Sequence, residues 1–305
     1  MSAARKPLVG LALGGGSARG WAHIGVIQAL EEAGIRPDLV CGTSVGALVG
    51  AAYAAGELER FRQWVLGLGI RDVVSLMDLQ LNGGMLKGER VMEYFRRNFV
   101  DRPIEELAMP FGAVATALET GREVWMRTGS TVQAIRASIA LPALFTPALR
   151  EGRLLVDGAL VNPVPVSLAR AMGAEILIAV DLSSDLIGRR LRDEDQAEEM
   201  PAGQVAEWVR RLQDRLGVRS SPADSGAPAL PSMLDVVATS LNIMQVRITR
   251  SRMAGDPPDV IVAPRLAHLG LLDFHRAAEA IEEGERAAAA ALPALRALGI
   301  AAEGA

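Results

Sequence analysis

The stretch Gly42-Thr43-Ser44-Val45-Gly46 has the residue types and spacing of a nucleophilic serine. It reads G-x-S-x-G and lies between a short apolar run and a segment of small helix-forming residues. In such a strand-to-helix turn, glycines on both sides leave room around the serine, so that its Oγ is exposed at the edge of a sheet. The pattern predicts nucleophilic attack by Ser44, with Gly42 and Gly46 supporting the turn.

A second loop, Gly14-Gly15-Gly16, directly follows another apolar run. Consecutive glycines expose backbone amides, which can hold either a phosphate or an oxyanion. A Walker-type phosphate loop needs Lys-Ser/Thr after its glycines, whereas Ser17-Ala18-Arg19 follows here. Arg19 also occupies the place of the last glycine of a dinucleotide-binding G-x-G-x-x-G. Oxyanion stabilisation by Gly14, Gly15 and Gly16 is therefore the favoured interpretation.

The base that would activate the serine is harder to identify. The chain has few histidines, and none follows a predicted sheet strand with acidic support; they are His23, His268 and His275. His23 is in line with apolar residues of a predicted helix, so a packed structural histidine is favoured over a general base. Asp157 ends a short apolar run and is the other candidate, although its unperturbed pKa of about 3.9 would have to be raised by desolvation. An aspartate that only fixes an Asp-Gly turn is the alternative.

The motifs GGGSARG, GTSVG and DGA, in this order, resemble the patatin-like phospholipase family, and most closely its bacterial members in the branch that includes neuropathy target esterase. The resemblance covers roughly residues 7–181, through RASIALPALFTP and LVDGALVNPVPV, and extends weakly to PPDVIVAP. It implies a Ser-Asp dyad with Ser44 as nucleophile and Asp157 as base. It also implies an oxyanion loop at Gly14 to Gly16, and Gly158 belongs to the third motif. Which loop amides face the oxyanion stays open, because two residues separate the glycines from the arginine.

Arg19 has two interpretations. It could bind a lipid phosphate, or it could brace the glycine loop through backbone carbonyls and a carboxylate. The brace is favoured, because recognition of a phosphate by one guanidinium requires an accessible pocket as well as the charge.

The surrounding elements predict how the motifs meet. Residues 8–13 and 39–41 are apolar runs separated by a helical segment at about 20–33, so they form a βαβ unit with parallel strands. Since both motif loops follow strands of this unit, they emerge at the same edge of the sheet. Further helices are predicted at about 44–55, 57–66, 88–99, 133–139, 164–172, 233–252 and from 274, and strands at about 111–118, 123–127, 154–156, 175–180 and 260–263.

This order of elements predicts one α/β domain, a patatin-like three-layer α/β/α fold with a mainly parallel central sheet. Residues 1–6 are predicted as an N-terminal tail, 7–290 as the catalytic domain and 291–305 as a C-terminal tail. Residues 185–232 are charge-dense and then rich in Ser, Pro, Ala and Gly, which predicts a mobile insertion. Within this insertion, residues 204–216 have the spacing of an amphipathic helix around Trp208. Docking of its apolar face on the catalytic domain or on a second subunit is favoured over binding to an anionic membrane.

Composition limits the classes of function. Half of the 305 residues are hydrophobic, which is ample for a core, and the net charge of −4 argues against a nucleic-acid partner. The single cysteine, Cys41, excludes an internal disulfide and a cysteine-based zinc site. Residues 39–56 lack charges, but their glycines and strand-like start argue against a membrane span. No signal peptide is predicted.

The sequence therefore predicts a serine esterase that hydrolyses carboxylic esters of lipids or phospholipids without a metal or an organic cofactor. An acyltransferase with the same dyad, and a non-enzymatic lipid-binding or interaction protein that keeps the fold, are the alternatives. The predicted partners are a lipid or acyl-ester substrate and, peripherally, a membrane surface. The predicted location is the cytoplasm, including the inner face of its membrane. No residue pattern indicates the head group, the acyl length, the cleaved position or the oligomeric state.

Overall fold

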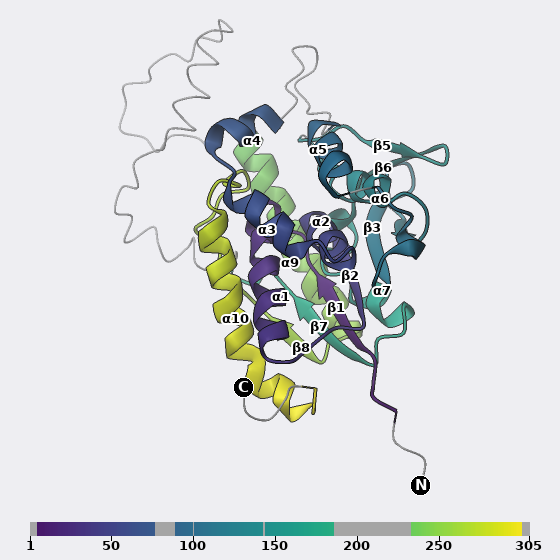
Figure 1. Cartoon of the computed structure of the whole chain (residues 1–305). Coiled ribbons are helices and arrows are strands. Elements are labelled where there is room, and N and C mark those ends of the chain that lie inside the picture. Colours follow the sequence, from purple (N-terminus) through teal and green to yellow (C-terminus); the bar gives the residue numbers. More distant parts are fainter. Residues whose placement is uncertain (1–4, 77–88, 100, 143, 186–232, 301–305) are drawn as a thin grey trace, which may run out of the picture.

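The computed structural model describes residues 5–76, 89–99, 101–142, 144–185 and 233–300 (Figure 1). Within this part, eight strands form one sheet in the order β5-β6-β3-β2-β1-β7-β8, and β4 pairs with β3 beside that path. The strands are β1 (Val9–Leu13), β2 (Leu39–Thr43), β3 (Phe111–Ala117), β4 (Glu123–Met126), β5 (Ala148–Arg150), β6 (Arg153–Asp157), β7 (Ile176–Val180) and β8 (Val260–Val262).

The helices largely follow the predicted segments, and α4 and the strand β5 are additional to them. The α-helices are α1 (Ala22–Glu32), α2 (Val45–Ala54), α3 (Leu58–Leu66), α4 (Ile70–Leu76), α5 (Glu89–Phe99), α6 (Thr131–Ser138), α7 (Val166–Ala171), α9 (Met233–Gly255) and α10 (Ala277–Ala297). Short 3-10 helices occur at η1 (Ser17–Trp21), η2 (Ile104–Glu106) and η3 (Gly158–Leu160).

The centre of the sheet is parallel, as predicted. β1 pairs in parallel with β2 and with β7, while β2 pairs with β3 and β7 with β8 in the same sense. The unit β1-α1-β2 is the predicted βαβ unit, with Gly10 opposite Leu39. β3 and β4, both predicted as strands, form an antiparallel hairpin, and β6 also runs antiparallel to β3. The carboxyl ends of β1 and β2 therefore meet at one edge of the sheet.

Two hydrophobic clusters cover the two faces of this sheet and make the fold three-layered. Alternate side chains of a strand point to opposite faces. Leu11 and Leu13 of β1 belong to the cluster that includes α1, α2, α6 and α10, whereas Ala12 belongs to the cluster with α7. Both faces of the parallel strands are buried, which explains why their sequences are apolar without alternation. The α/β/α architecture is confirmed.

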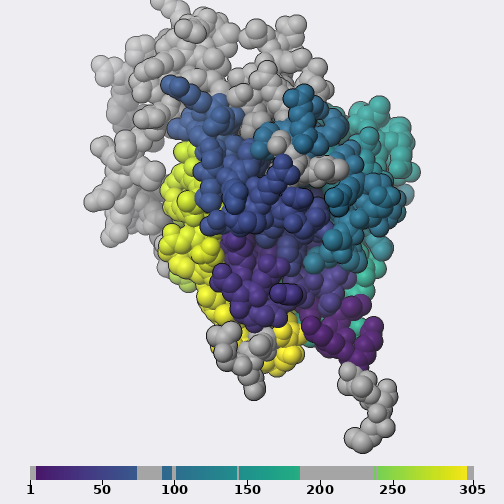
Figure 2. Space-filling view, in the orientation of Figure 1, coloured from purple at the N-terminus to yellow at the C-terminus, as the bar shows by residue number. Residues whose placement is uncertain are grey.

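The C-terminal helix α10 packs along α1 at close range. A Cβ atom on Gly25 would lie 1.9 Å from the carbonyl oxygen of Ile281, and one on Gly284 would lie 2.0 Å from that of Ala22. Only glycine permits this approach of the two backbones. Figure 1 shows α1 and α10 side by side although they come from opposite ends of the chain, and in Figure 2 the yellow and purple residues form one continuous surface.

The helix α10 also extends past residue 290, where the sequence analysis ended the domain. It continues to Ala297 with Pro293 inside it, and Leu295 is fully buried. Residues 291–297 therefore belong to the packed domain and not to a tail, because their apolar face contributes to the same core as α1.

Two sequence predictions concern membrane contact. The predicted amphipathic helix at 204–216, with Trp208, lies outside the described residues. Among the residues that are described, no helix combines the length and the apolar character needed to cross a bilayer. Residues 39–56, which lack charges, form the strand β2 and the buried helix α2 instead.

Candidate active site

Ser44 lies in a sharp turn between β2 and α2, as the G-x-S-x-G pattern predicts. Its φ of 56° and ψ of −126° form a conformation that residues with a side chain rarely adopt. A Cβ atom on Gly42 would lie 2.3 Å from the carbonyl oxygen of Gly46, and one on Gly46 would lie 2.2 Å from that of Leu13. Both glycines are therefore required by backbone packing, and strain of roughly 1–3 kcal/mol is held at the serine.

The Ser44 hydroxyl donates a hydrogen bond to the carboxylate of Asp157, with 2.6 Å between Oγ and Oδ2. Asp157 ends β6 and is fully buried. Its other oxygen, Oδ1, accepts the backbone N–H of Ala159 at 2.8 Å. A Cβ atom on Gly158 would lie 2.3 Å from the carbonyl oxygen of Val114, so the Asp-Gly pair fits a close approach to β3. The two residues predicted as a dyad are thus brought into direct contact.

Burial changes the acid-base behaviour of Asp157. Desolvation raises the pKa of its carboxyl group to about 7, and the hydrogen bonds from Ser44 and Ala159 oppose this rise with a smaller effect. A carboxylate whose pKa lies near neutrality can accept a proton at physiological pH far better than an exposed aspartate can.

Ser138 on α6 fixes the backbone of the turn and was not found by sequence reasoning. The backbone N–H of Ser44 donates to Ser138 Oγ at 2.8 Å, and that hydroxyl donates to the carbonyl oxygen of Val114 at 2.6 Å. Ser138 is fully buried. It therefore ties the strained turn to β3. Its only sequence signal was its place in the segment RASIALPALFTP.

The glycine loop lies against the serine, but its amides are not all available. A Cβ atom on Gly15 would lie 3.5 Å from that of Ser44. The N–H of Gly14 donates to Val180 and that of Gly15 donates to Pro163, at 3.0 and 2.9 Å. These two amides of the predicted oxyanion loop are already satisfied, which bears on the question that the sequence left open, namely which loop amides could face an oxyanion. Within the described chain, the amides of Gly16 and Ser17 have no backbone acceptor.

Arg19 and His23 both form hydrogen bonds to backbone carbonyl groups of the glycine loop. Arg19 is 2 % exposed, and its Nε donates to the carbonyl oxygen of Gly16 at 3.1 Å. His23 is fully buried and its Nε2 lies 2.7 Å from the carbonyl oxygen of Gly14. Burial lowers the pKa of His23 to about 4, so the ring is neutral and Nε2 is the donor. These contacts fit the bracing role of Arg19 and a packed structural role for His23.

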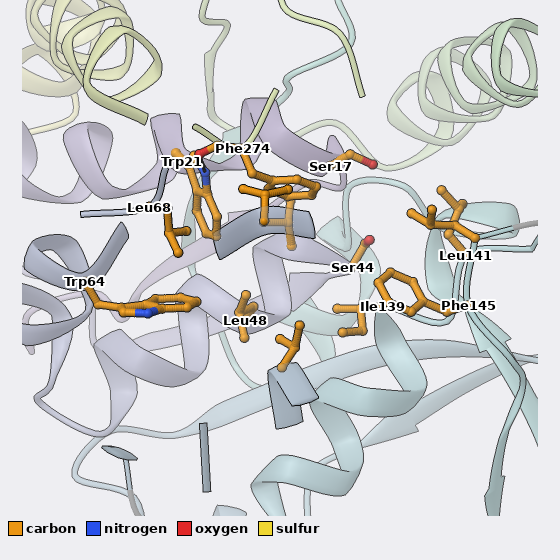
Figure 3. Close-up of a pocket in the computed structure, with 14 residues that line it drawn as sticks. Ser17, Trp21, Ser44, Leu48, Trp64, Leu68, Ile139, Leu141, Phe145 and Phe274 are labelled. Carbon is orange, nitrogen blue, oxygen red and sulfur yellow. Dashed lines mark hydrogen bonds between the residues drawn. The ribbon is translucent and has the colours of Figure 1, made fainter. Parts of the chain in front are cut away.

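An apolar cavity of about 100 Å³ begins at the Ser44 hydroxyl. Figure 3 shows Trp21, Leu48 and Trp64 to one side of the serine and Leu141 and Phe145 to the other. The lining is apolar except for two serines and consists of Ser17, Trp21, Ser44, Val45, Leu48, Trp64, Leu68, Val73, Val91, Ile139, Leu141, Leu144, Phe145 and Phe274. Such a cavity suits a hydrocarbon chain whose polar end stays at Ser44.

A second, smaller cavity also reaches Ser44 and is lined by Asp157, Arg19 and residues of α9. The helix α9 was predicted from sequence, but none of its residues was predicted to line the site. Among the described residues, no group of three or more His, Cys, Asp or Glu side chains could hold a metal ion.

The fold and the turn define a class: a three-layer α/β/α protein with a serine at the carboxyl edge of a parallel sheet, hydrogen-bonded to a buried aspartate. Residues 11–170 match the family model described as patatin-like phospholipase. The chain belongs to this family, and the family supports hydrolysis of lipid esters.

Relatives with curated sequences agree with this placement. The chain is 33% identical over 94% of its length to an uncharacterized NTE family protein of Mycobacterium tuberculosis, of which it covers 92%. It is 36% identical over 58% of its length to human patatin-like phospholipase domain-containing protein 6, covering 13% of that protein. Lysophospholipase nte1 of Emericella nidulans is 34% identical over 58% of the chain, which covers 12% of it.

Proposed function

We propose that this protein is a serine esterase that hydrolyses carboxylic esters of lipids through a Ser44–Asp157 dyad. The observation that carries the proposal is the 2.6 Å hydrogen bond between the Ser44 hydroxyl and a buried carboxylate at the mouth of an apolar cavity. The family supports lipid esters as the substrate class, and one relative is named a lysophospholipase.

In the proposed first step, the acyl chain occupies the apolar cavity and the ester carbonyl lies at Ser44. Ser44 Oγ attacks the carbonyl carbon while its proton moves to Asp157 Oδ2. The tetrahedral oxyanion accepts hydrogen bonds from the amides of Gly16 and Ser17, the loop donors without a backbone acceptor. The bond to the leaving alcohol breaks as Asp157 returns the proton to the alcohol oxygen.

In the second step, water attacks the acyl group on Ser44 and gives its proton to Asp157. The bond between the acyl carbon and Ser44 Oγ then breaks, and Asp157 returns the proton to Oγ. The products are a free acid and the original enzyme. The same dyad would serve an acyltransferase, in which an alcohol takes the place of water.

A fluorophosphonate probe tests the proposed function directly. Only a serine that is activated as a nucleophile attacks the phosphorus, so the probe is expected to label the purified protein on the tryptic peptide that contains Ser44. The same preparation is expected to release free acid from a panel of acyl esters. Absence of both reactions in folded protein would favour the non-enzymatic lipid-binding alternative.

Rates are expected to depend on pH through Asp157. Because the base must be ionised and burial raises its pKa to about 7, kcat/KM is expected to fall about tenfold for each pH unit below that value and to level off above it. The measurement is kcat/KM for a non-ionising ester between pH 5 and about 9. A flat profile down to pH 5 would contradict an aspartate base with a raised pKa.

The burial of Asp157 also affects stability: the protein is expected to become less stable as the pH rises, whereas its activity rises. Between about pH 4 and 7 the folded state holds the Asp157 proton and the unfolded chain releases it. The free energy of unfolding therefore falls as the pH rises through this window, by roughly 4 kcal/mol from this group. Asp157→Asn removes the fall, so thermal melting at pH 8 is expected to show this variant to be more stable than the wild type.

The apolar cavity is expected to set the preferred acyl length. Leu48 lines it from α2, and Leu48→Phe fills part of the space. Excluding two methylenes forfeits roughly 0.8 kcal/mol each, so kcat/KM for an octanoyl ester is expected to fall about 15-fold while that for an acetyl ester stays unchanged. The matched control is Leu118→Phe, at a side chain that is 48% exposed and outside the cavity. Equal losses on both esters would exclude this role.

Contact with a membrane and a cytoplasmic location stay predictions from the sequence.

A further inference from the structure

The smaller cavity beside the dyad differs from the apolar one in size and in chemistry. Its volume is about 10 Å³, close to the space that a single water molecule requires. It is lined by both members of the dyad, whereas the apolar cavity is lined by Ser44 without Asp157. Helix α9 closes it with Leu241, Asn242 and Gln245.

Two amide side chains of α9 bring uncommitted hydrogen-bonding groups to this cavity. Asn242 Oδ1 accepts from Arg19 Nη2 at 3.3 Å, and a guanidinium can only donate. The amide oxygen of Asn242 is therefore committed, and its Nδ2 group keeps donors without an acceptor among the described residues. Gln245, one turn further along α9, has no side-chain hydrogen bond to any described residue.

Deacylation places strict demands on the attacking water. Its oxygen must reach the acyl carbon on Ser44, and one of its protons must be within hydrogen-bond distance of Asp157. An ordered water also needs two to four polar partners to stay in place. The small cavity meets these demands, because it borders Ser44 and Asp157 and is lined by four further polar side chains, those of Ser17, Arg19, Asn242 and Gln245.

We propose that this cavity holds the attacking water of deacylation and that Asn242 and Gln245 of α9 are positioning residues for it. The inference rests on the proposed esterase function. The water oxygen forms a bond to the acyl carbon, its proton goes to Asp157, and the bond to Ser44 Oγ breaks as Asp157 returns that proton to Oγ. Because the space in this cavity is close to that of one water molecule, a larger alcohol fits it poorly, and α9 therefore favours hydrolysis of the acyl-enzyme over transfer.

The partition between acid and ester products tests this assignment. Wild type and variants are incubated with p-nitrophenyl butyrate and added glycerol, and mass spectrometry measures the ratio of glyceryl butyrate to butyric acid. Gln245→Ala removes a polar partner of the water, which is expected to slow hydrolysis about fivefold, the effect of one lost hydrogen bond, and it also widens the cavity for glycerol, so the ratio is expected to rise about fivefold or more. Gln245→Met loses the same polar partner but keeps the volume filled, so its ratio is expected to rise less than that of Gln245→Ala.

The control is Met244→Ala, a neighbour of similar size that is 48% exposed and does not line the cavity. It is expected to keep the wild-type ratio, and fluorophosphonate labelling is expected to proceed at the same rate in all four proteins, because acylation does not use this water. If the wild type is active and Gln245→Ala keeps the wild-type ratio, the inference is overturned while the proposed function stands. A wild type that is neither labelled nor able to release p-nitrophenol would overturn the proposed function and the inference together.

Discussion

Ester hydrolysis is expected to fall by about four orders of magnitude or more when either Ser44 or Asp157 is replaced. Ser44→Ala removes the attacking oxygen, and Asp157→Asn keeps the shape of the side chain but cannot take up the serine proton at neutral pH. The check is kcat/KM for a short, freely dissolved acyl ester, together with fluorophosphonate labelling, which Ser44→Ala should lose entirely. Thermal melting must show that both variants are folded.

His23 supplies the control that separates a dyad from a triad. It is buried behind the glycine loop and hydrogen-bonds to Gly14, and no hydrogen bond joins it to Ser44 or Asp157 in the described part of the chain. His23→Gln keeps an N–H donor for that carbonyl but removes the imidazole base. It is expected to retain a measurable share of activity. A folded His23→Gln protein as inactive as Ser44→Ala would exclude the dyad.

A single methyl group at Gly46 is expected to destabilise the whole domain. The Cβ atom of alanine would lie 2.2 Å from the Leu13 carbonyl oxygen and 2.7 Å from that of Gly14, and backbone atoms cannot move aside as a side chain can. Gly46→Ala is expected to lower the free energy of unfolding by about 3 kcal/mol or more. Urea denaturation followed by circular dichroism measures the change, and a variant that fails to accumulate as folded protein agrees with it.

Gly255→Ala is the matched control for Gly46→Ala. Both residues lie in helices, but a Cβ atom on Gly255 would have no heavy atom within 4 Å. The free energy of unfolding of Gly255→Ala is expected to stay within about 0.5 kcal/mol of that of the wild type. Equal effects of the two substitutions would contradict the close approach of α2 to the glycine loop.

The sequence predicted the parts of the site that are local in the chain. Ser44 and the glycine loop were placed correctly because each follows a strand of the same βαβ unit, and chain direction alone brings those strand ends together. The turn glycines Gly42 and Gly46 were predicted from the local motif, although only the close contact of Gly42, with Gly46, is local, whereas that of Gly46 is with Leu13 of β1. Most of the helices and strands followed from apolar periodicity and from Gly and Pro.

Features that depend on long-range pairing were harder to predict. Asp157 was a candidate because it ends a short apolar run, but the strand β6 that it ends runs antiparallel to β3, so chain direction does not bring it to Ser44. It reaches the serine because it pairs opposite Ala115, next to Val114, which pairs with Thr43. Such a register cannot be derived from residue spacing, and the residue was assigned through the family motif.

Asn242 and Gln245 had no sequence signal at all. They lie about 200 residues from Ser44 in the chain, and single amide side chains on an otherwise ordinary helix form no pattern that indicates chemistry. The sequence also could not show which amides of the glycine loop already have an acceptor. The carbonyl groups of Val180 and Pro163, which accept from Gly14 and Gly15, come from distant parts of the chain.

The close packing of α1 against α10 also sets the order in which the protein can mature on the ribosome. Gly25 of α1 faces α10 and Gly284 of α10 faces α1, yet Gly284 is synthesised about 260 residues after Gly25. At roughly 5–20 residues per second, this interval lasts on the order of 13–50 s. During that time the face of α1 that packs against α10 has no partner helix. The helix α1 can complete its native packing only after α10 has been translated.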